Sequence, residues 1–336
     1  MEYHSNNFVQ AVLNSPRRFV MPIMTTPGIE LIHAKPVEVF QDGELQFRCI
    51  EALAQTVHAD ALVTFMDLSV EAEAFGAPIR YSEHENPTVS DRIVAEETDI
   101  QRLAIPAVGS ARTAEVLKCA GLCAEKLPDR PTFGGMIGPF SLAGRLADMT
   151  EMMILAAAEP ETARLLLDKA TTFLTAYAGA IKATGVAGLL IAEPAAGLLS
   201  PEMCQTFAAD YLQKIIQAVQ DEKFTVILHN CGKTEKQIPA LLSTGAAALH
   251  LGNAVDLAAI LPQVPGSIPV MGNIDPVGIL KNAEPQEVYA ATKALLEATR
   301  SDRNFVLSTG CDVPPGVNLA NIKAFFQAAE DFNRQR

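Results

Sequence analysis

The sequence predicts an α/β protein with the architecture of a (β/α)8 TIM barrel. Eight short apolar runs rich in Val, Ile, Leu and Phe recur along its 336 residues. None of them alternates cleanly between apolar and polar residues, which is typical of strands buried on both faces. Helical patterns lie between the runs, and strands that alternate with helices predict parallel βαβ units. Because eight such units close a barrel, we expect a single domain over residues 1–336.

The apolar runs also divide the chain. In order they are FVMPIM from residue 19, ALVTFM from 61, TFGGMI from 132, AGLLIA from 187, FTVILH from 224, AAALHL from 246, IPVMGN from 268 and NFVLST from 304. An open, doubly wound sheet is the alternative, but no G-x-G-x-x-G pattern follows any run. Residues 1–18 form an N-terminal extension. The stretch 67–110 is longer than a βα unit needs and is predicted to cross the barrel mouth as an excursion.

Three segments show the spacing of amphipathic helices. Over 160–185, apolar residues recur at three- and four-residue intervals until Gly185 ends the pattern. Over 200–220, Ser200 can cap a second helix. The third helix is predicted over 318–333, at the end of the sequence.

Composition excludes several classes of protein. The net charge is -13, so an acidic surface repels phosphate backbones and nucleic-acid binding is not expected. No stretch approaches the ~20 apolar residues that span a bilayer, and the N-terminus lacks a signal-peptide pattern. We therefore expect no membrane association and a cytoplasmic location. In a reducing compartment the six cysteines are interpreted as buried thiols or metal ligands.

Polar residues gather where the apolar runs end. In a barrel of this kind the chemistry lies at the carboxyl ends of the strands. The residues there are Asp67, Glu193, His229 with Cys231, His250 with Asn253, Asn273 with Asp275, and Cys311 with Asp312. They are scattered in sequence, but a barrel would bring them to one rim.

Three of these residues have the chemistry of a metal site. His229 and Cys231 are two apart, so on a strand they point to the same side, roughly 6–7 Å apart. Cys311 ends the last run. One imidazole and two thiolates make three of the four tetrahedral ligands that zinc favours, and a vacant fourth position is typical of a catalytic zinc site.

Each candidate also has a simpler interpretation. A lone cysteine is most often a small buried apolar residue, and packing is the favoured role for Cys49, Cys119, Cys123 and Cys204. Asp67 could cap a helix or turn, and Glu193 could be a rim residue paired with a base. His250 lies inside an apolar run, where a hydrogen-bonded core histidine is the commoner case.

The motifs resemble those of the uroporphyrinogen decarboxylase superfamily. The segments that carry the resemblance are VTFMDLSVEAEAFGAPI, IGPFSLAGRL, VILHNCGK, GNID and STGCDVPPGVNLANIKAF, and the similarity extends from about residue 17 to 333. The resemblance implies a (β/α)8 barrel with its active site at the carboxyl ends of the strands. This agrees with the eight apolar runs.

Two branches of this superfamily differ in chemistry. The decarboxylases use no metal, bind a porphyrinogen through an R-Q-A-G-R loop after the first strand, and carry a G-H-G-V-P pattern near the C-terminus. The methylcobalamin:coenzyme M methyltransferases carry a zinc motif, H-x-C followed by a distant cysteine. Here His229, Cys231 and Cys311 match the zinc motif, and GCDVPPG stands where the decarboxylase histidine would be. After the first run the chain reads MTTPGIELIH, without arginine. Only Asp67 matches the decarboxylases.

The resemblance therefore implies a zinc-dependent transfer of a methyl group from a methylated corrinoid to a thiol such as coenzyme M. His229, Cys231 and Cys311 would bind the zinc. We assign Asp67 and Glu193 as candidate catalytic residues. The candidate cofactor-binding residues are Asn273, Asp275 and His250. An anionic acceptor would need a nearby cation, for which Lys233 and Arg145 are candidates.

The corrinoid is expected on a separate protein, because no D-x-H-x-x-G cobalt-binding pattern occurs here. That partner would contact the loops around 67–110. Two alternatives stay open. One is decarboxylation of a tetrapyrrole or related carboxylate, with Asp67 central. The other is a barrel that binds zinc, a thiol or a corrinoid without turnover.

Overall fold

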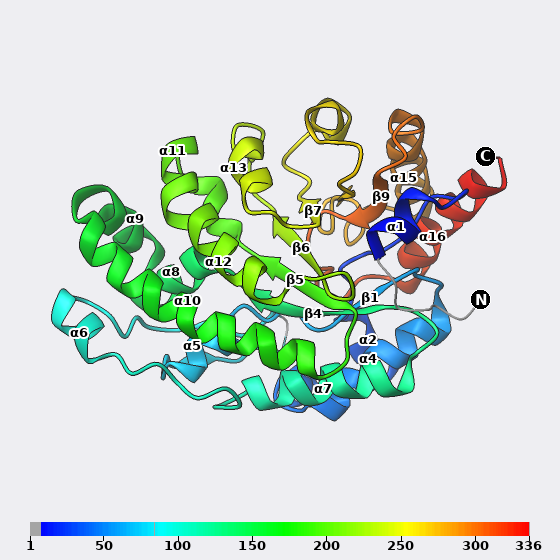
Figure 1. Ribbon diagram of the computed structural model, residues 1–336. Coiled ribbons are helices and arrows are strands. Elements are labelled where there is room, and N and C mark those ends of the chain that lie inside the picture. Colours follow the sequence, from blue (N-terminus) through cyan, green and yellow to red (C-terminus); the bar gives the residue numbers. More distant parts are fainter. Residues whose placement is uncertain (1–7, 84, 336) are drawn as a thin grey trace.

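The computed structural model describes residues 8–83 and 85–335, and its centre is a curled, all-parallel sheet of seven strands (Figure 1). The strand order is β1-β4-β5-β6-β7-β8-β9. The strands are β1 (Leu62–Val63), β4 (Thr132–Ile137), β5 (Gly188–Ala192), β6 (Thr225–Asn230), β7 (Ala248–Leu251), β8 (Val270–Ile274) and β9 (Phe305–Thr309). Neighbours in the sheet are also consecutive among these strands in sequence, and at least one helix lies between each pair. This is the connectivity of a TIM-barrel-like fold.

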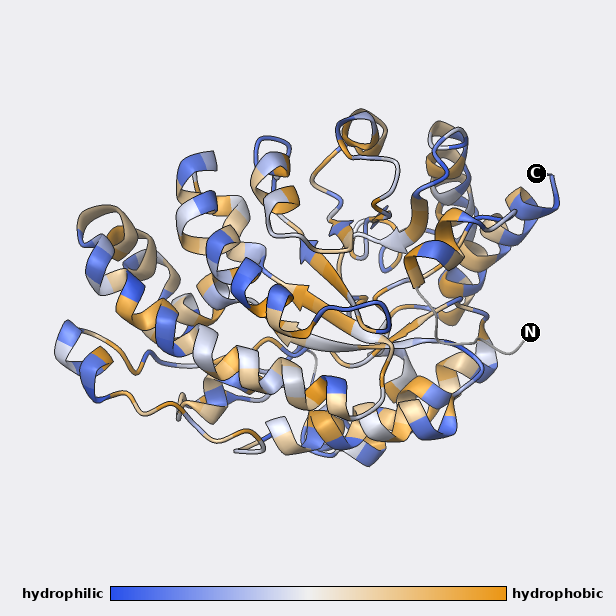
Figure 2. Cartoon of the chain, in the orientation of Figure 1, coloured by the Kyte–Doolittle hydropathy of each residue, from blue (hydrophilic) through white to orange (hydrophobic). Residues whose placement is uncertain are grey.

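The helices surround the sheet, and Figure 2 shows polar residues on their outer faces and apolar residues along the strands. They are α1 (Phe8–Leu13), α2 (Pro27–Leu31), α3 (Pro36–Val39), α4 (Gly43–Thr56), α5 (Val70–Ala74), α6 (Glu97–Arg102), α7 (Thr113–Lys126), α8 (Pro139–Ala147), α9 (Met149–Ala158), α10 (Pro160–Ala183), α11 (Pro201–Cys204), α12 (Asp210–Val219), α13 (Ile238–Ser243), α14 (Leu257–Ile260), α15 (Pro285–Ala298) and α16 (Leu319–Arg334), with the short turns η1 (Pro194–Leu198), η2 (Gln205–Ala209) and η3 (Leu261–Gln263). Over the described residues, none is long and apolar enough to span a bilayer.

Seven of the eight predicted strands are present, and the first run differs. Its residue Val20 forms a single parallel bridge with Leu307 of β9. On its other side, the backbone N–H of Asp60 donates to the carbonyl of Val20 over 2.8 Å. The run thus lies between β9 and β1 without becoming a strand. Toward β1, Pro22 has no N–H to donate, and toward β9 the N–H of Ile23 donates to the hydroxyl of Thr309 over 3.1 Å in place of a backbone carbonyl. In the described residues the barrel is consequently not closed by eight strands.

One end of the barrel interior is covered by α1, which belongs to the predicted N-terminal extension. Phe8 packs edge-to-face on Phe133 of β4, with ring centroids 4.9 Å apart. Phe8 and Val12 belong to the same apolar cluster as inward-facing strand residues such as Ile227 and Val306. Residues 1–7 lie outside the described part of the chain. Because α1 contacts the start of β4, the opposite end, where the strands finish, is left for a site.

The predicted excursion follows β1. It contains α5, an antiparallel pair of β2 (Ile79–Arg80) and β3 (Thr88–Val89), and α6. Residues 85–88, which lead from the β2–β3 connection into the first residue of β3, line a cavity at the carboxyl ends of the strands. Part of the excursion therefore lies beside this cavity.

Of the three predicted helices, two form as continuous elements. They are α10 and α16, and Asn318 caps α16 by accepting a hydrogen bond from the N–H of Ala320. The predicted helix over 200–220 is instead divided into α11, the π-helical turn η2 and α12. Ser200 caps its start, as its position in the sequence indicates.

Candidate metal centre

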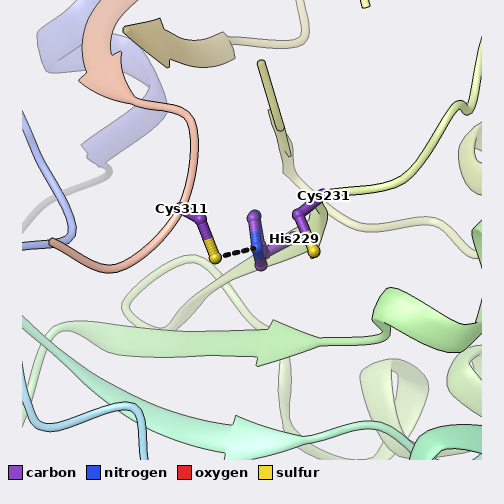
Figure 3. Close-up of side chains that lie close together, drawn as sticks. All are labelled: His229, Cys231 and Cys311. Carbon is purple, nitrogen blue, oxygen red and sulfur yellow. Dashed lines mark hydrogen bonds between the residues drawn. The ribbon is translucent and has the colours of Figure 1, made fainter. Parts of the chain in front are cut away.

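The metal-ligating triad predicted from the sequence is assembled at the carboxyl ends of β6 and β9. His229 is the penultimate residue of β6, Cys231 follows that strand by one residue, and Cys311 follows β9 by two. Their potential ligand atoms all lie within 4.8 Å of one another. The Sγ of Cys311 lies 3.8 Å from the Nε2 of His229 (Figure 3). Over the described residues this is the one group of three or more His, Cys, Asp or Glu side chains with such spacing.

The chain around Cys231 is held by a tight turn. Asn230 ends β6, and its side-chain oxygen accepts a hydrogen bond from the N–H of Gly232 over 2.9 Å. Its amide nitrogen donates to the carbonyl of Glu193 over 2.6 Å. On the other side, a Cβ on Gly252 would lie 2.5 Å from the Cα of Cys231. The backbone of this ligand is therefore fixed by close packing that only a glycine at 252 allows.

The thiols of Cys231 and Cys311 differ in pKa, because one donates a hydrogen bond to the other. The largest effect on Cys231 is a hydrogen bond from Cys311, which, with the nearby His229, lowers its pKa to about 4 in spite of burial. The same hydrogen bond and burial raise the pKa of Cys311. Cys231 therefore ionises first, while Cys311 keeps its proton and donates it. Thiolate sulfur and imidazole nitrogen are the donors that a soft or borderline divalent metal favours.

The triad faces a cavity of about 700 Å³. Its lining includes Asn86 of the excursion, Arg145 of α8, Lys281, and Asp312, together with the apolar Ile23, Met66, Leu68 and Ala192. Neither Arg145 nor Lys281 forms an ion pair with another described residue. A second cavity of about 470 Å³ shares Leu68, Arg145 and Pro194 with the first. The triad thus lies at the wall of a space large enough for a small organic molecule.

Arg145 was a sequence candidate for an anion-binding residue and does line the cavity, whereas Lys233, the other candidate, is not among its lining residues. Asn86 and Lys281 were missed. Neither directly follows an apolar run, so the strand-end rule could not select them. Asp312 was noted beside Cys311 but not assigned a role. Burial raises its pKa to about 7, against the effects of the Asn86 amide and the Val313 N–H.

The candidate catalytic residue Asp67 is not brought to the cavity. It is buried, and it forms an ion pair with Arg112 of the segment before α7. Its other oxygen accepts hydrogen bonds from the N–H and the hydroxyl of Ser69 over 2.9 and 2.6 Å. Since both oxygens are occupied, Asp67 stabilises the start of the excursion. This matches the simpler interpretation of a turn cap.

The candidate catalytic residue Glu193 is also turned away from the cavity. Its carboxylate accepts hydrogen bonds from the N–H of Phe140 over 2.9 Å, from the N–H of Ser141 over 2.7 Å and from the Ser141 hydroxyl. These donors form the first turn of α8, where N–H groups lack helical partners. Burial raises the pKa of Glu193 to about 7, although the hydrogen bonds from Ser141 and Phe140 oppose it. A Cβ on Gly138 would lie 2.3 Å from this carboxylate, which explains the glycine before Pro139.

The candidate cofactor-binding residues are likewise held by the protein itself. The amide of Asn273 donates to the carbonyls of Gly252 and Val255 over 2.9 and 2.8 Å. Asp275 accepts from the N–H groups of Val277 and Gly278, each over 2.9 Å. His250 lies in β7 and contacts His229 from behind, with the two Nδ1 atoms 2.8 Å apart. Burial and the adjacent His229 lower its pKa. None of the three is among the residues that line the cavity.

The curled parallel sheet and the thiol–imidazole cluster at its carboxyl edge define a TIM-barrel-like protein with a candidate metal centre. The chain belongs to the uroporphyrinogen decarboxylase (URO-D) family, whose model matches residues 16–332. The methylcobamide:CoM methyltransferase MtbA of Methanosarcina mazei is 28% identical over 299 residues, which cover 88% of this chain and 86% of that protein. The uroporphyrinogen decarboxylase of Legionella pneumophila is 26% identical over 286 residues, which cover 82% of this chain and 80% of the relative.

Among solved structures, a methyltransferase from Methanosarcina mazei superposes with a TM-score of 0.87 and 24% identity, covering 96% of this chain and 97% of that one. This likeness supports the fold. The family resemblance predicted from the motifs is thus confirmed, and the relatives also confirm the expectation of an enzyme of the methyltransferase type.

Proposed function

We propose that this chain is a zinc-dependent corrinoid methyltransferase. It would move a methyl group from a methylated corrinoid, carried by a separate protein, to a small-molecule thiol such as coenzyme M. The observation that carries the proposal is the convergence of His229, Cys231 and Cys311, whose ligand atoms lie within 4.8 Å at the wall of a cavity. The methylcobamide:CoM methyltransferases among the relatives support the same class of reaction.

The residues of the cluster fit zinc. Two sulfurs and one imidazole nitrogen are ligands that zinc favours, and three protein ligands leave a fourth position for a substrate. A zinc ion held by these residues would supply a Lewis acid that keeps an acceptor thiol deprotonated at neutral pH. Both cysteines are only partly buried, so the cluster is accessible from the cavity.

In the proposed reaction, the acceptor sulfur forms a bond to the methyl carbon while the cobalt–carbon bond breaks. The electron pair of that bond stays on cobalt, and the thiol proton is released. The chain's own contribution is to hold the acceptor in line with the methyl group and to exclude water. The apolar wall made by Ile23, Met66 and Leu68 serves the second purpose. Arg145 and Lys281 provide positive charge for an acceptor with an anionic end.

The decarboxylase alternative is weakened by the position of Asp67. Its carboxylate is occupied by Arg112 and Ser69, so it is not free to contact a tetrapyrrole in the cavity. We propose that Asp67, Glu193, Asn273 and Asp275 hold the elements around the site in place and do not touch the substrate. Closure of the barrel by an eighth strand, a single-domain organisation and a cytoplasmic location stay predictions.

The test combines metal analysis with spectroscopy. We expect about one zinc per chain, and loss of the methylcobalamin spectrum when a thiol acceptor is added. Cys231→Ala and Cys311→Ala should each lose zinc and thiol-dependent demethylation. Cys123→Ala is the matched control, because Cys123 is a buried thiol of α7 that is not in the cluster. A wild-type protein without zinc, or demethylation that persists in both cluster variants, would contradict the proposal.

A further inference from the structure

The imidazole of His229 has polar contacts on both of its nitrogens. Its Nε2 faces the thiols, 3.8 Å from the Sγ of Cys311. Its Nδ1 lies 2.8 Å from the Nδ1 of His250, and the two rings meet edge-to-face at a centroid distance of 4.7 Å. The Nε2 of His250 in turn lies 2.8 Å from the Oγ of Ser308 in β9. All three side chains are at most 3% exposed, so water does not substitute for these contacts.

The protons on His229 and His250 can be placed in only one consistent way if His229 is to bind a metal. A ligating Nε2 must present a lone pair, so the proton of His229 sits on Nδ1 and is donated to the Nδ1 of His250. That nitrogen must then be an acceptor, which places the proton of His250 on Nε2. From there it is donated to the hydroxyl oxygen of Ser308. The alternative, with a proton on the Nδ1 of His250, would set two donors against each other at 2.8 Å.

We propose that His250 and Ser308 are positioning residues that orient His229 and fix its tautomer for metal binding. This inference rests on the proposed zinc site. A residue that accepts a hydrogen bond from the non-ligating nitrogen of a metal-bound imidazole holds the ring in one orientation and increases its basicity. Loss of such a residue typically weakens metal binding by about 10- to 100-fold. The alternative is that His250 merely fills space among buried strand residues. In that case an apolar side chain of similar volume would serve equally well.

Two substitutions at 250 separate these roles. In His250→Asn the side-chain oxygen takes the place of Nδ1 and still accepts from His229, whereas His250→Leu keeps an apolar volume and removes the acceptor. Zinc affinity is measured by competition with a chromogenic chelator. We expect the dissociation constant to rise about 10- to 100-fold in His250→Leu and to stay near the wild-type value in His250→Asn. The ligand-field spectrum of the cobalt-substituted protein should change only in His250→Leu.

Ser308→Ala tests the outer contact, which is not in reach of the metal itself. Without the serine oxygen, the proton of His250 can shift to Nδ1, so zinc binding should weaken in the same direction as in His250→Leu. The double variant should be no weaker than His250→Leu alone, because both changes act through one hydrogen bond. Thermal unfolding of the metal-free variants shows whether any effect is a general loss of stability.

Equal zinc affinity in His250→Leu and the wild type would overturn the inference, as would equal losses in His250→Leu and His250→Asn. The failure of the proposed function looks different. A wild-type protein that does not bind zinc removes the basis of the metal site. A wild-type protein that binds zinc tightly, with variants that bind it equally well, removes only the role of His250 and Ser308.

Discussion

The carboxylate of Glu193, at the end of β5, accepts a hydrogen bond from the backbone N–H of Ser141 in the first turn of α8 over 2.7 Å. Together with the contacts to Phe140 and the Ser141 hydroxyl, it closes the N-terminus of a helix that also carries Arg145 into the cavity. Glu193 thus connects a strand end to the position of a cavity residue. It acts as a helix cap supplied from another element, with the favourable charge for that helix end.

Removing this cap should lower stability more than it alters chemistry. Glu193→Ala leaves three buried donors without an acceptor, and we expect a loss of about 3–5 kcal/mol in the free energy of unfolding, measured with urea. Ser141→Ala, which removes one donor, should cost about 1 kcal/mol. A catalytic acid would behave otherwise: folded, zinc-loaded Glu193→Gln would then lose turnover by more than about 100-fold.

The buried Glu71 of α5 should make stability depend on pH. One oxygen accepts from the N–H of Ile137 over 3.0 Å, and the other has no hydrogen-bond partner among the residues that the structure describes. Burial is the main cause that raises its pKa from 4.5 to about 7. The folded state therefore holds a proton that the unfolded state releases between these values. Glu71 therefore favours the folded state most below pH 4.5. As the pH rises from 4.5 to about 7, the free energy of unfolding falls by up to about 3 kcal/mol.

Glu71→Gln isolates this contribution, because it keeps an oxygen for Ile137 and cannot ionise. We expect its stability to equal that of the wild type near pH 4.5 and to exceed it near pH 8. Urea unfolding across this range gives the difference between the two proteins, in which the shared effect of Glu193 cancels. A difference that does not change with pH would show that the pKa of Glu71 is the same in the folded and unfolded states.

The sequence predicts which residues stand at strand ends more reliably than it predicts where their side chains point. The triad was predictable because an H-x-C pair at the end of a strand places both ligands on one side, and because parallel strands bring Cys311 to the same edge. Glu193 also stands at a strand end. It turns to α8 because the free N–H groups of that helix attract a carboxylate, and that interaction depends on tertiary packing.

The same limit applies to the fold. The other seven runs became strands because they are buried on both faces. The run at 19 did not. Toward β1, Pro22 has no N–H to donate, and toward β9 the N–H of Ile23 donates to the hydroxyl of Thr309 in place of a backbone carbonyl. Asn86 and Lys281 were missed because loops bring them to the mouth. Their sequence surroundings carry no sign of the cavity.

The buried pair of Asp67 and Arg112 predicts an asymmetric mutational effect. Arg112 also contacts Glu73 and stacks over Tyr81, 5.2 Å from the ring centroid. Arg112→Met leaves the Asp67 carboxylate buried without its partner, so we expect a loss of about 3–5 kcal/mol in the free energy of unfolding. The double variant Asp67→Asn/Arg112→Met should recover part of that loss. Additive losses in a urea double-mutant cycle would indicate that the two side chains do not interact.

Gly252 should control zinc binding without contacting the metal. A Cβ at this position would lie 2.5 Å from the Cα and 2.7 Å from the carbonyl oxygen of Cys231, so Gly252→Ala must displace that ligand. Such overpacking typically costs about 1–3 kcal/mol of strain. Each 1.4 kcal/mol by which that strain destabilises the zinc-bound protein relative to the zinc-free protein weakens zinc binding about tenfold. Gly121→Ala in α7 is the control, because its Cβ would meet no atom within 4 Å. An unchanged zinc affinity in Gly252→Ala would mean that the turn at Cys231 relaxes freely.

Arg145 should select acceptors by charge if the proposed reaction is correct. It lines both adjoining cavities and has no ion-pair partner among residues 8–83 and 85–335, so its guanidinium is available to an anionic group. A hydrogen bond to a charged group contributes about 1.5–3 kcal/mol, which predicts a rise of at least about tenfold in KM for a sulfonated or carboxylated thiol in Arg145→Gln. The KM for an uncharged thiol such as 2-mercaptoethanol should change little, and zinc content should be unchanged. Equal rises in KM for both thiols would show that Arg145 supports the cavity wall and does not bind the anion. Comparing the two thiols in one variant therefore separates recognition of the acceptor's charge from a change in the shape of the cavity.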